Sequence, residues 1–182
     1  MSRIRLFDEL PVLSDGAVLL RKLEDRDREA LWEFAHTGRI YRYLPTFLME
    51  QSDEDAGVVL DRMYGKCMDE KTSMILGVFP EKDDSFCGLA EFYGYKESIH
   101  KTCIGYRLAE RFWGRGLASA AVALMVDYLF SKTDVEIITA STMVENHASA
   151  RVLEKNGFIR TSHAVPEDWG YDAPTVADKW FR

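Results

Sequence analysis

Apolar residues recur every three to four positions in four stretches of the chain, which is the spacing of helices with one buried face. The second stretch shows the pattern clearly, because Val59, Met63 and Cys67 are four residues apart. Ser52 and Asp55 stand before them in the positions of a capping box, which marks the start of a helix. The predicted helices cover residues 24–38, 52–70, 117–131 and 147–155.

Segments rich in β-branched and aromatic residues make up the rest of the pattern, and turn-forming residues bound them. Three of these segments are separated by turn signals such as EKDD and KESIH, which predicts an antiparallel meander. Residues 162–174 are predicted to form a loop, and YLPTF (43–47) an irregular loop that lines a pocket. The predicted strands cover residues 17–23, 73–79, 85–95, 101–108 and 135–142, a segment that opens at Phe158, and residues 175–182.

Composition limits the classes of protein that this pattern allows. The chain has 182 residues, 47% of them apolar and 29% charged, so one α+β domain over residues 1–182 is expected. The net charge is −7 and the basic residues are scattered, which argues against a nucleic-acid partner. The chain shows neither a signal peptide nor an apolar run of about 20 residues, so we expect a cytoplasmic protein with no membrane partner.

The cysteines and histidines give no metal signal. Cys67, Cys87 and Cys103 are far apart, without metal-ligand or redox spacing, and are expected to be buried thiols. The four histidines are isolated from acidic or cysteine partners at ligand spacing. No metal ion is therefore expected.

RFWGRGLA (111–118) joins a predicted strand to the long predicted helix at 117–131. A helix start presents unpaired N–H groups and the positive end of the helix dipole, which favour an anion. Gly114 and Gly116 allow a tight turn there, and Arg111 and Arg115 add positive charge. The segment thus predicts a pyrophosphate site, although the glycines would also serve a plain strand-to-helix turn. It is neither a P-loop nor a dinucleotide fingerprint.

Two motifs resemble those of a known family. R111-x-x-G114-x-G116 is similar to the Q/R-x-x-G-x-G/A signature of the GCN5-related N-acetyltransferases (GNAT), and IGYRL (104–108) looks like their pantetheine-binding strand. NHASARVLEKNGF (146–158) resembles the closing motif of the RimJ/RimL-like branch, which acetylates ribosomal-protein N-termini. The resemblance implies a single GNAT domain. Its fold would be a mixed, mostly antiparallel sheet of six or seven strands with a central splay, flanked by about four helices.

The resemblance also implies a reaction: acetyl-CoA gives its acetyl group to a primary amine or α-amine, by direct attack through a tetrahedral intermediate. A main-chain N–H near Tyr106 or Arg107 would stabilise the oxyanion. The residues implied in acetyl-CoA binding are Ile104, Tyr106, Arg107, Leu108, Arg111, Gly114, Arg115, Gly116, Leu117, Ala118, Asn146 and Ser149.

Catalysis needs a group that removes a proton from the amine and one that assists the leaving thiolate. Glu91, Glu167, Asp168 or a water chain are the candidates for the first role, with Asp168 preferred. Each carboxylate would equally serve as a surface charge or in a structural ion pair. The resemblance assigns the second role to Ser149, which would otherwise help to cap its helix, and Asn146 is the expected N-cap.

The acceptor stays open between a peptide N-terminus, a polyamine, an amino sugar and a drug. After GRG the chain continues LASAA, with Ala120 near the place where many relatives carry a glutamate, so acceptor chemistry does not carry over from them directly. The alternative function is a catalytically silent acyl-CoA sensor or assembly protein with the same fold. A homodimer is a further expectation, formed through an exposed final strand at 175–182.

Overall fold

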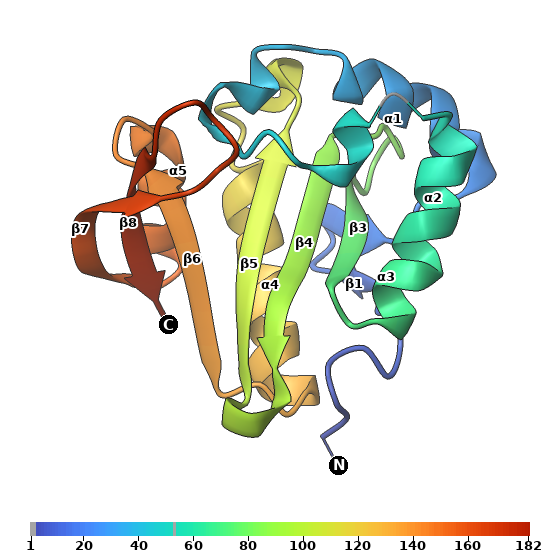
Figure 1. Ribbon diagram of the computed structural model, residues 1–182. Helices are drawn as coiled ribbons and strands as arrows, with labels where there is room; N and C mark the ends of the chain where they lie inside the picture. The colour runs from blue at the N-terminus through green and yellow to red at the C-terminus, as the bar shows by residue number, and fades with distance from the viewer. Residues whose placement is uncertain (1–2, 53) are drawn as a thin grey trace.

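The computed structural model describes residues 3–52 and 54–182 and contains one eight-stranded sheet (Figure 1). The strand order is β1-β2-β3-β4-β5-β6-β8-β7, and every neighbouring pair is antiparallel except β5 with β6. The mixed, mostly antiparallel sheet is as expected, with one strand more than predicted because β1 has only two residues. The strands are β1 (Leu13–Ser14), β2 (Val18–Arg21), β3 (Ser73–Pro80), β4 (Gly88–Lys96), β5 (Lys101–Leu108), β6 (Ile137–Met143), β7 (Ile159–Glu167) and β8 (Thr175–Phe181).

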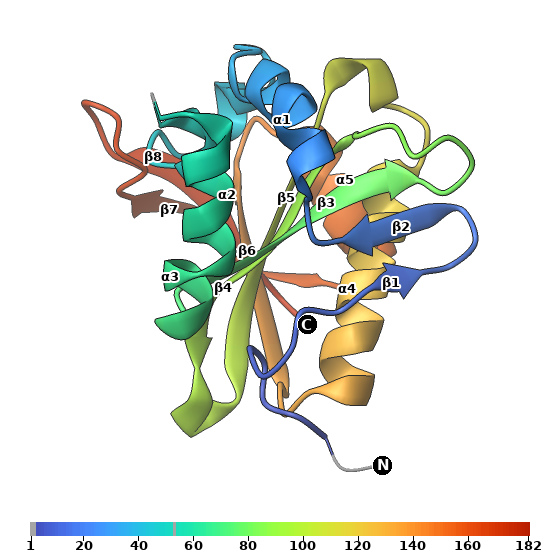
Figure 2. The same cartoon turned by 90° about the vertical axis from the view of Figure 1, so that its right-hand side faces the viewer.

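Helices cover both faces of the sheet. Figure 2 shows α2 and α3 on one side of the central strands and α4 on the other. None of the helices among the described residues is long and apolar enough to cross a membrane. The helices are α1 (Arg28–Ala35), α2 (Ala56–Tyr64), α3 (Lys66–Asp69), α4 (Leu117–Lys132) and α5 (His147–Lys155), with 3-10 turns at Asp25–Asp27, Ile40–Tyr43, Met49–Gln51, Glu97–Ile99 and Glu110–Phe112.

The central strands are buried on both faces, which explains why they read as unbroken apolar runs. In β3, Met74 and Leu76 pack into the core beneath α4, while Ile75 packs into a second core beneath α1 and α2. Gly77 makes the second core possible, because a Cβ at this position would lie 2.5 Å from a methyl carbon of Leu23. The sheet is therefore held in place from both sides.

The helix start predicted at a capping box is wrong in detail. Asp55 itself is the N-cap of α2, and its carboxylate accepts the Gly57 N–H at 2.8 Å, whereas Ser52 lies outside the helix. The helix also ends earlier than predicted, because the backbone leaves the helical conformation at Gly65 and a separate short helix follows. An aspartate carboxylate can accept a hydrogen bond from the free N–H two residues later in the chain. Asp55 therefore caps the helix in place of Ser52, and the helix starts after Asp55.

The end of the chain differs from the prediction in two ways. β7 continues to Glu167 through part of the expected loop at 162–174, because it pairs with β8 with register shifts near Ser162 and Val165. β8 lies between β6 and β7, so the final strand is not the exposed edge that we expected for a homodimer. Pairing on both sides takes up its backbone hydrogen bonds.

The cap of α2 is open to a direct test. Asp55→Ala should lower the free energy of unfolding by about 1 kcal/mol, because a free N–H at the helix start loses its acceptor. Ser52→Ala should change it by less than about 0.5 kcal/mol. Urea unfolding of both variants beside the parent protein measures the difference, and equal losses would support the capping box instead.

Candidate active site

The two central strands part in the middle of the sheet. β5 and β6 pair only at Lys101–Ile137, Thr102–Ile138 and Cys103–Thr139, and beyond these pairs they separate (Figure 1). This parting is the predicted splay. A cavity of about 330 Å³ occupies it. Its lining is Tyr43, Leu44, Pro45, Phe47, Leu48, Met49, Ser73, Glu91, Tyr93, Ile104, Gly105, Tyr106, Arg107, Ala140, Ser141, Thr142, Asn146, Ser149, Leu153, Glu167, Asp168 and Trp169.

The cavity joins the two faces of the sheet, because neighbouring residues of β5 line it from opposite sides. The Tyr106 side chain reaches α5, where its hydroxyl bonds to Ser149. The Arg107 side chain reaches the opposite face, where it pairs with Glu50. Two ligands can therefore meet in the gap between the strands, one from each face.

The α5 side carries a short chain of hydroxyl groups. Asn146 caps α5 as predicted, its amide oxygen accepting the Ser149 N–H at 3.2 Å. The Tyr106 hydroxyl lies 2.7 Å from the Ser149 hydroxyl and 3.1 Å from the Ser149 carbonyl oxygen. Burial raises the pKa of Tyr106 well above its ordinary value, against a smaller opposing effect of its bond to Ser149. The phenol therefore stays protonated at neutral pH and can donate.

The opposite side is built on a buried arginine. The Arg107 guanidinium bonds to both oxygens of buried Glu50, and at 2.9 Å to Glu91. Burial by itself would lower the pKa of Arg107, but the two carboxylates outweigh it and hold that pKa above its ordinary value. The other Glu91 oxygen accepts the Ser73 hydroxyl at 2.6 Å, and Tyr41 donates to Glu50. Glu91 is thus held in an ion pair, the alternative role that the sequence left open.

Glu167, the last residue of β7, and Asp168, which follows it, differ in how many hydrogen-bond donors their carboxylates accept. Glu167 forms an ion pair with Lys179 and accepts the Trp169 indole N–H at 2.9 Å, so both of its oxygens have partners. Exposed Asp168 accepts the Gly170 N–H at 2.9 Å through one oxygen. Its second oxygen has no hydrogen bond from the described part of the chain.

The loop at 111–118 has the backbone that the sequence predicted. Gly114 and Gly116 have φ values of 71° and 78°, which glycine adopts without strain. Gly116 caps α4 without a side chain, and the first bond inside the helix runs from the Ala120 N–H, so the N–H groups of residues 117–119 face outward. The Arg111 and Arg115 guanidinium groups lie 5.0 and 5.6 Å from the centre of the Phe112 ring. These features suit a pyrophosphate.

Residues 17–159 match the family model of the acetyltransferase (GNAT) domain. The chain belongs to this family. Its relatives include YjcK of Bacillus subtilis (strain 168), a probable N-acetyltransferase that is 32% identical over 81% of this chain and 83% of its own length. The ribosomal protein uS5-alanine N-acetyltransferase of Escherichia coli (strain K12) is 24% identical over 51% of this chain and 48% of its own.

Solved structures confirm the fold. RimL, a ribosomal L7/L12 α-N-protein acetyltransferase solved with coenzyme A, superimposes with a TM-score of 0.80 at 16% identity, covering 94% of this chain and 97% of that one. The predicted family is thereby confirmed, and ribosomal-protein N-acetyltransferases are among the proteins that the chain is similar to. The chain is an N-acetyltransferase of the GNAT type.

The structure brings many, but not all, of the predicted site residues to one cavity. The three candidate bases line it together with the predicted residues of α5. Leu108 is instead buried at the end of β5, and residues 111–118, which lead into α4, do not line the cavity. The predicted residues that line the cavity are Glu91, Ile104, Tyr106, Arg107, Asn146, Ser149, Glu167 and Asp168.

Two contributors to the site, Glu50 and Lys179, were not recognised from the sequence, and Tyr106 was predicted as a binding residue without a role for its side chain. Glu50 and Lys179 are single charged residues in otherwise ordinary segments, and each gains its role only by meeting a charge on another element of the fold. The Tyr106 side chain was missed because the resemblance pointed to the backbone of its strand. The expected pocket wall at 43–47 is confirmed, and Leu48 and Met49 extend it.

The ion pair between Glu50 and Arg107 should be important for stability. Glu50→Ala leaves the buried Arg107 with a single carboxylate partner, and should lower the free energy of unfolding by about 3 kcal/mol. Glu54→Ala is the matched control, because Glu54 pairs with Arg62 at the surface and should contribute less than about 1 kcal/mol. Urea unfolding distinguishes the two variants. Equal losses of unfolding free energy would contradict a stabilising role for the pair of Glu50 with Arg107.

Proposed function

We propose that the chain transfers an acetyl group from acetyl-CoA to a primary amine or α-amine. The observation that carries this proposal is the cavity between β5 and β6, which joins a hydroxyl-lined face to a carboxylate-lined face. A thioester entering from one face and an amine entering from the other would meet there. Membership of the GNAT family supports the same reaction.

The acetyl-CoA would be held by main-chain groups more than by side chains. Beyond Cys103, β5 has no strand partner toward β6, so its free edge suits the amide-rich pantetheine arm. The outward N–H groups at the start of α4 suit the pyrophosphate, with Arg111 and Arg115 nearby. Bound acetyl-CoA supplies an acetyl group already activated as a thioester.

Ser149 and Tyr106 would act on the leaving thiolate. If the Tyr106 phenol donates to the Ser149 hydroxyl, the Ser149 proton is free to turn toward the sulfur. Tyr106 is suited to this because burial keeps its proton in place. We assign Ser149 the direct contact with the thiolate, and Tyr106 the role of orienting and polarising Ser149.

Asp168 would accept the proton of the incoming amine, directly or through water. A protonated amine, with a pKa of about 10, cannot attack, so a base is required at neutral pH. Glu91 and Glu167 have both oxygens occupied by donors, whereas Asp168 keeps one oxygen available. Glu91 would instead place negative charge beside the ammonium without accepting its proton.

Thermal unfolding with acetyl-CoA, followed by thiol release with a panel of amines, tests the reaction. A ligand that binds only the folded state raises the melting temperature with its concentration, so we expect such a rise, and thiol release with at least one amine. No rise at saturating acetyl-CoA would refute the proposed site. A rise without thiol release from any amine would favour the sensor alternative.

The assignment of Ser149 and Tyr106 predicts a graded loss of turnover. Ser149→Ala should lower kcat about 100-fold and Tyr106→Phe about tenfold, with the KM for acetyl-CoA nearly unchanged, because both act on the leaving group. Tyr95→Phe is the control, since the Tyr95 hydroxyl bonds to Asp134, outside the cavity lining. Steady-state thiol release measures all three, and an unchanged kcat in Ser149→Ala would contradict the assignment.

The pyrophosphate site predicts a salt-dependent loss of affinity. Changing Arg111 and Arg115 together to alanine should weaken acetyl-CoA binding about tenfold at low ionic strength, with a smaller effect at high salt because exposed charges are screened. Arg62→Ala removes an exposed arginine of α2 and should leave the affinity unchanged. Calorimetric titration with acetyl-CoA at two salt concentrations measures the affinities. An affinity of the double variant equal to that of the parent protein would place the pyrophosphate elsewhere.

A further inference from the structure

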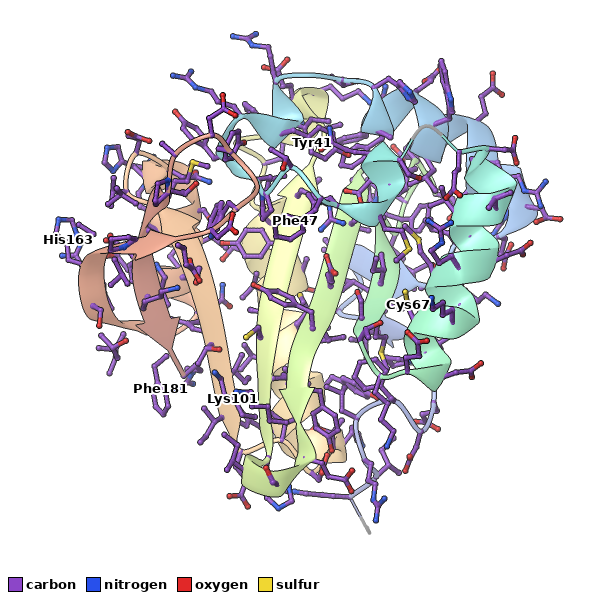
Figure 3. The ribbon with its side chains drawn as sticks, viewed as in Figure 1. Tyr41, Phe47, Cys67, Lys101, His163 and Phe181 are labelled. Atoms are coloured by element: carbon purple, nitrogen blue, oxygen red, sulfur yellow. The ribbon has the colours of Figure 1, made fainter. Side chains whose placement is uncertain are left out.

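The carboxylate-lined side of the cavity has apolar walls. One of these walls is formed by the segment before Glu50, in which only Thr46 does not line the cavity, and Trp169 and Tyr93 also line it. Phe47 lies over the upper part of β5 in Figure 3, and the residue is 68% exposed although it lines the cavity. The apolar residues of this run are Tyr43, Leu44, Pro45, Phe47, Leu48 and Met49. An acceptor bound here would place an apolar group against these side chains.

Two loops on this side of the cavity are hydrogen-bonded to each other. The Thr46 N–H donates to the Trp169 carbonyl oxygen at 2.9 Å, and the Tyr171 hydroxyl donates to the Leu44 carbonyl oxygen at 2.6 Å. The loops at 43–47 and 168–171 are thus joined beside the cavity. Its volume of about 330 Å³ is near the lower end for small-molecule sites. The group that enters must therefore be compact.

The charged groups leave room for a single ammonium. Four charged residues line the cavity, and Glu91, Arg107 and Glu167 are all held in ion pairs. Only Asp168 among these carboxylates keeps an oxygen without a donor from the described residues. A second ammonium on the acceptor would lose its hydration without gaining a carboxylate of its own, which is unfavourable.

Lys179 lies outside the cavity lining but determines how many carboxylates of the cavity are available to an ammonium group. It lies on β8, where its ammonium pairs with Glu167 and donates to the Ser141 hydroxyl at 3.2 Å. Without Lys179, the Glu167 carboxylate would face the cavity with the Trp169 indole as its remaining partner. A second carboxylate would then be available to a second ammonium.

We infer that the acceptor is a compact amine with one positive charge beside an apolar or aromatic group, and that Lys179 sets this preference by neutralising Glu167. The inference rests on the proposed function and narrows it, since it excludes polyamines as preferred acceptors. A free small amine and a peptide whose first residue is apolar share this chemistry. Lys179 is a positioning residue here, because it acts through Glu167.

Matched acceptors test the preference in the unaltered protein. Norleucine amide and lysine amide differ by the terminal ammonium of the lysine side chain, and kcat/KM from thiol release should favour norleucine amide at least about tenfold. Phenylalanine amide and a tripeptide that begins with phenylalanine then separate the two sources of the amine. Equal or better use of lysine amide or spermidine overturns the inference and leaves the proposed function standing. If none of the acceptors gives thiol release, both the inference and the proposed function are overturned.

Variants test the roles of Lys179 and Phe47 with the same acceptors. Lys179→Met should reduce the preference for norleucine amide over lysine amide by about tenfold, whereas Lys179→Arg should retain it. Phe47→Ala should raise the KM for norleucine amide several-fold, and Ile159→Ala, which removes a side chain that is also 68% exposed on β7, should not. An unchanged ratio in a folded Lys179→Met protein overturns the assignment of Lys179.

Discussion

The separation of β5 from β6 after Cys103 is the constraint on which the rest of the structure depends. Two parallel strands that stop pairing in the centre of a sheet leave main-chain groups without partners, and such groups are costly when they are buried away from water. The gap persists because each strand is paired on its other side, β5 with β4 and β6 with β8. The cavity, the free edge and the meeting of two faces all follow from it.

One strand serves both faces of this gap because side chains alternate along it. Tyr106 and Arg107 are adjacent in sequence, yet one bonds to Ser149 of α5 and the other to Glu50 on the opposite face. The arginine is buried, so it needs its carboxylates, and through Glu50 it holds the segment that forms the apolar wall. The strand that would bind the acetyl donor thus also fixes the wall for the acceptor.

The three carboxylates that line the cavity differ in how many partners their surroundings provide. Glu91 and Glu167 are held by cations and other donors, whereas Asp168 lies in a short loop with one oxygen engaged. A carboxylate whose two oxygens both have donors has none left for a further partner, while a half-satisfied one keeps an oxygen available. The same neutralisation restricts how much positive charge an acceptor can bring.

The sequence by itself determined the features that depend on neighbouring residues: the long helix α4, the positive φ at Gly114 and Gly116, and the Asn146 cap. These form within a turn or two, so their signal is local. The tertiary structure alone decided the place of β8 inside the sheet and the ion pairs of Glu50 with Arg107 and Glu167 with Lys179. Strand order and ion pairs join residues distant in the chain, and a lone charge or a short apolar run has the same local pattern whatever it will meet after folding.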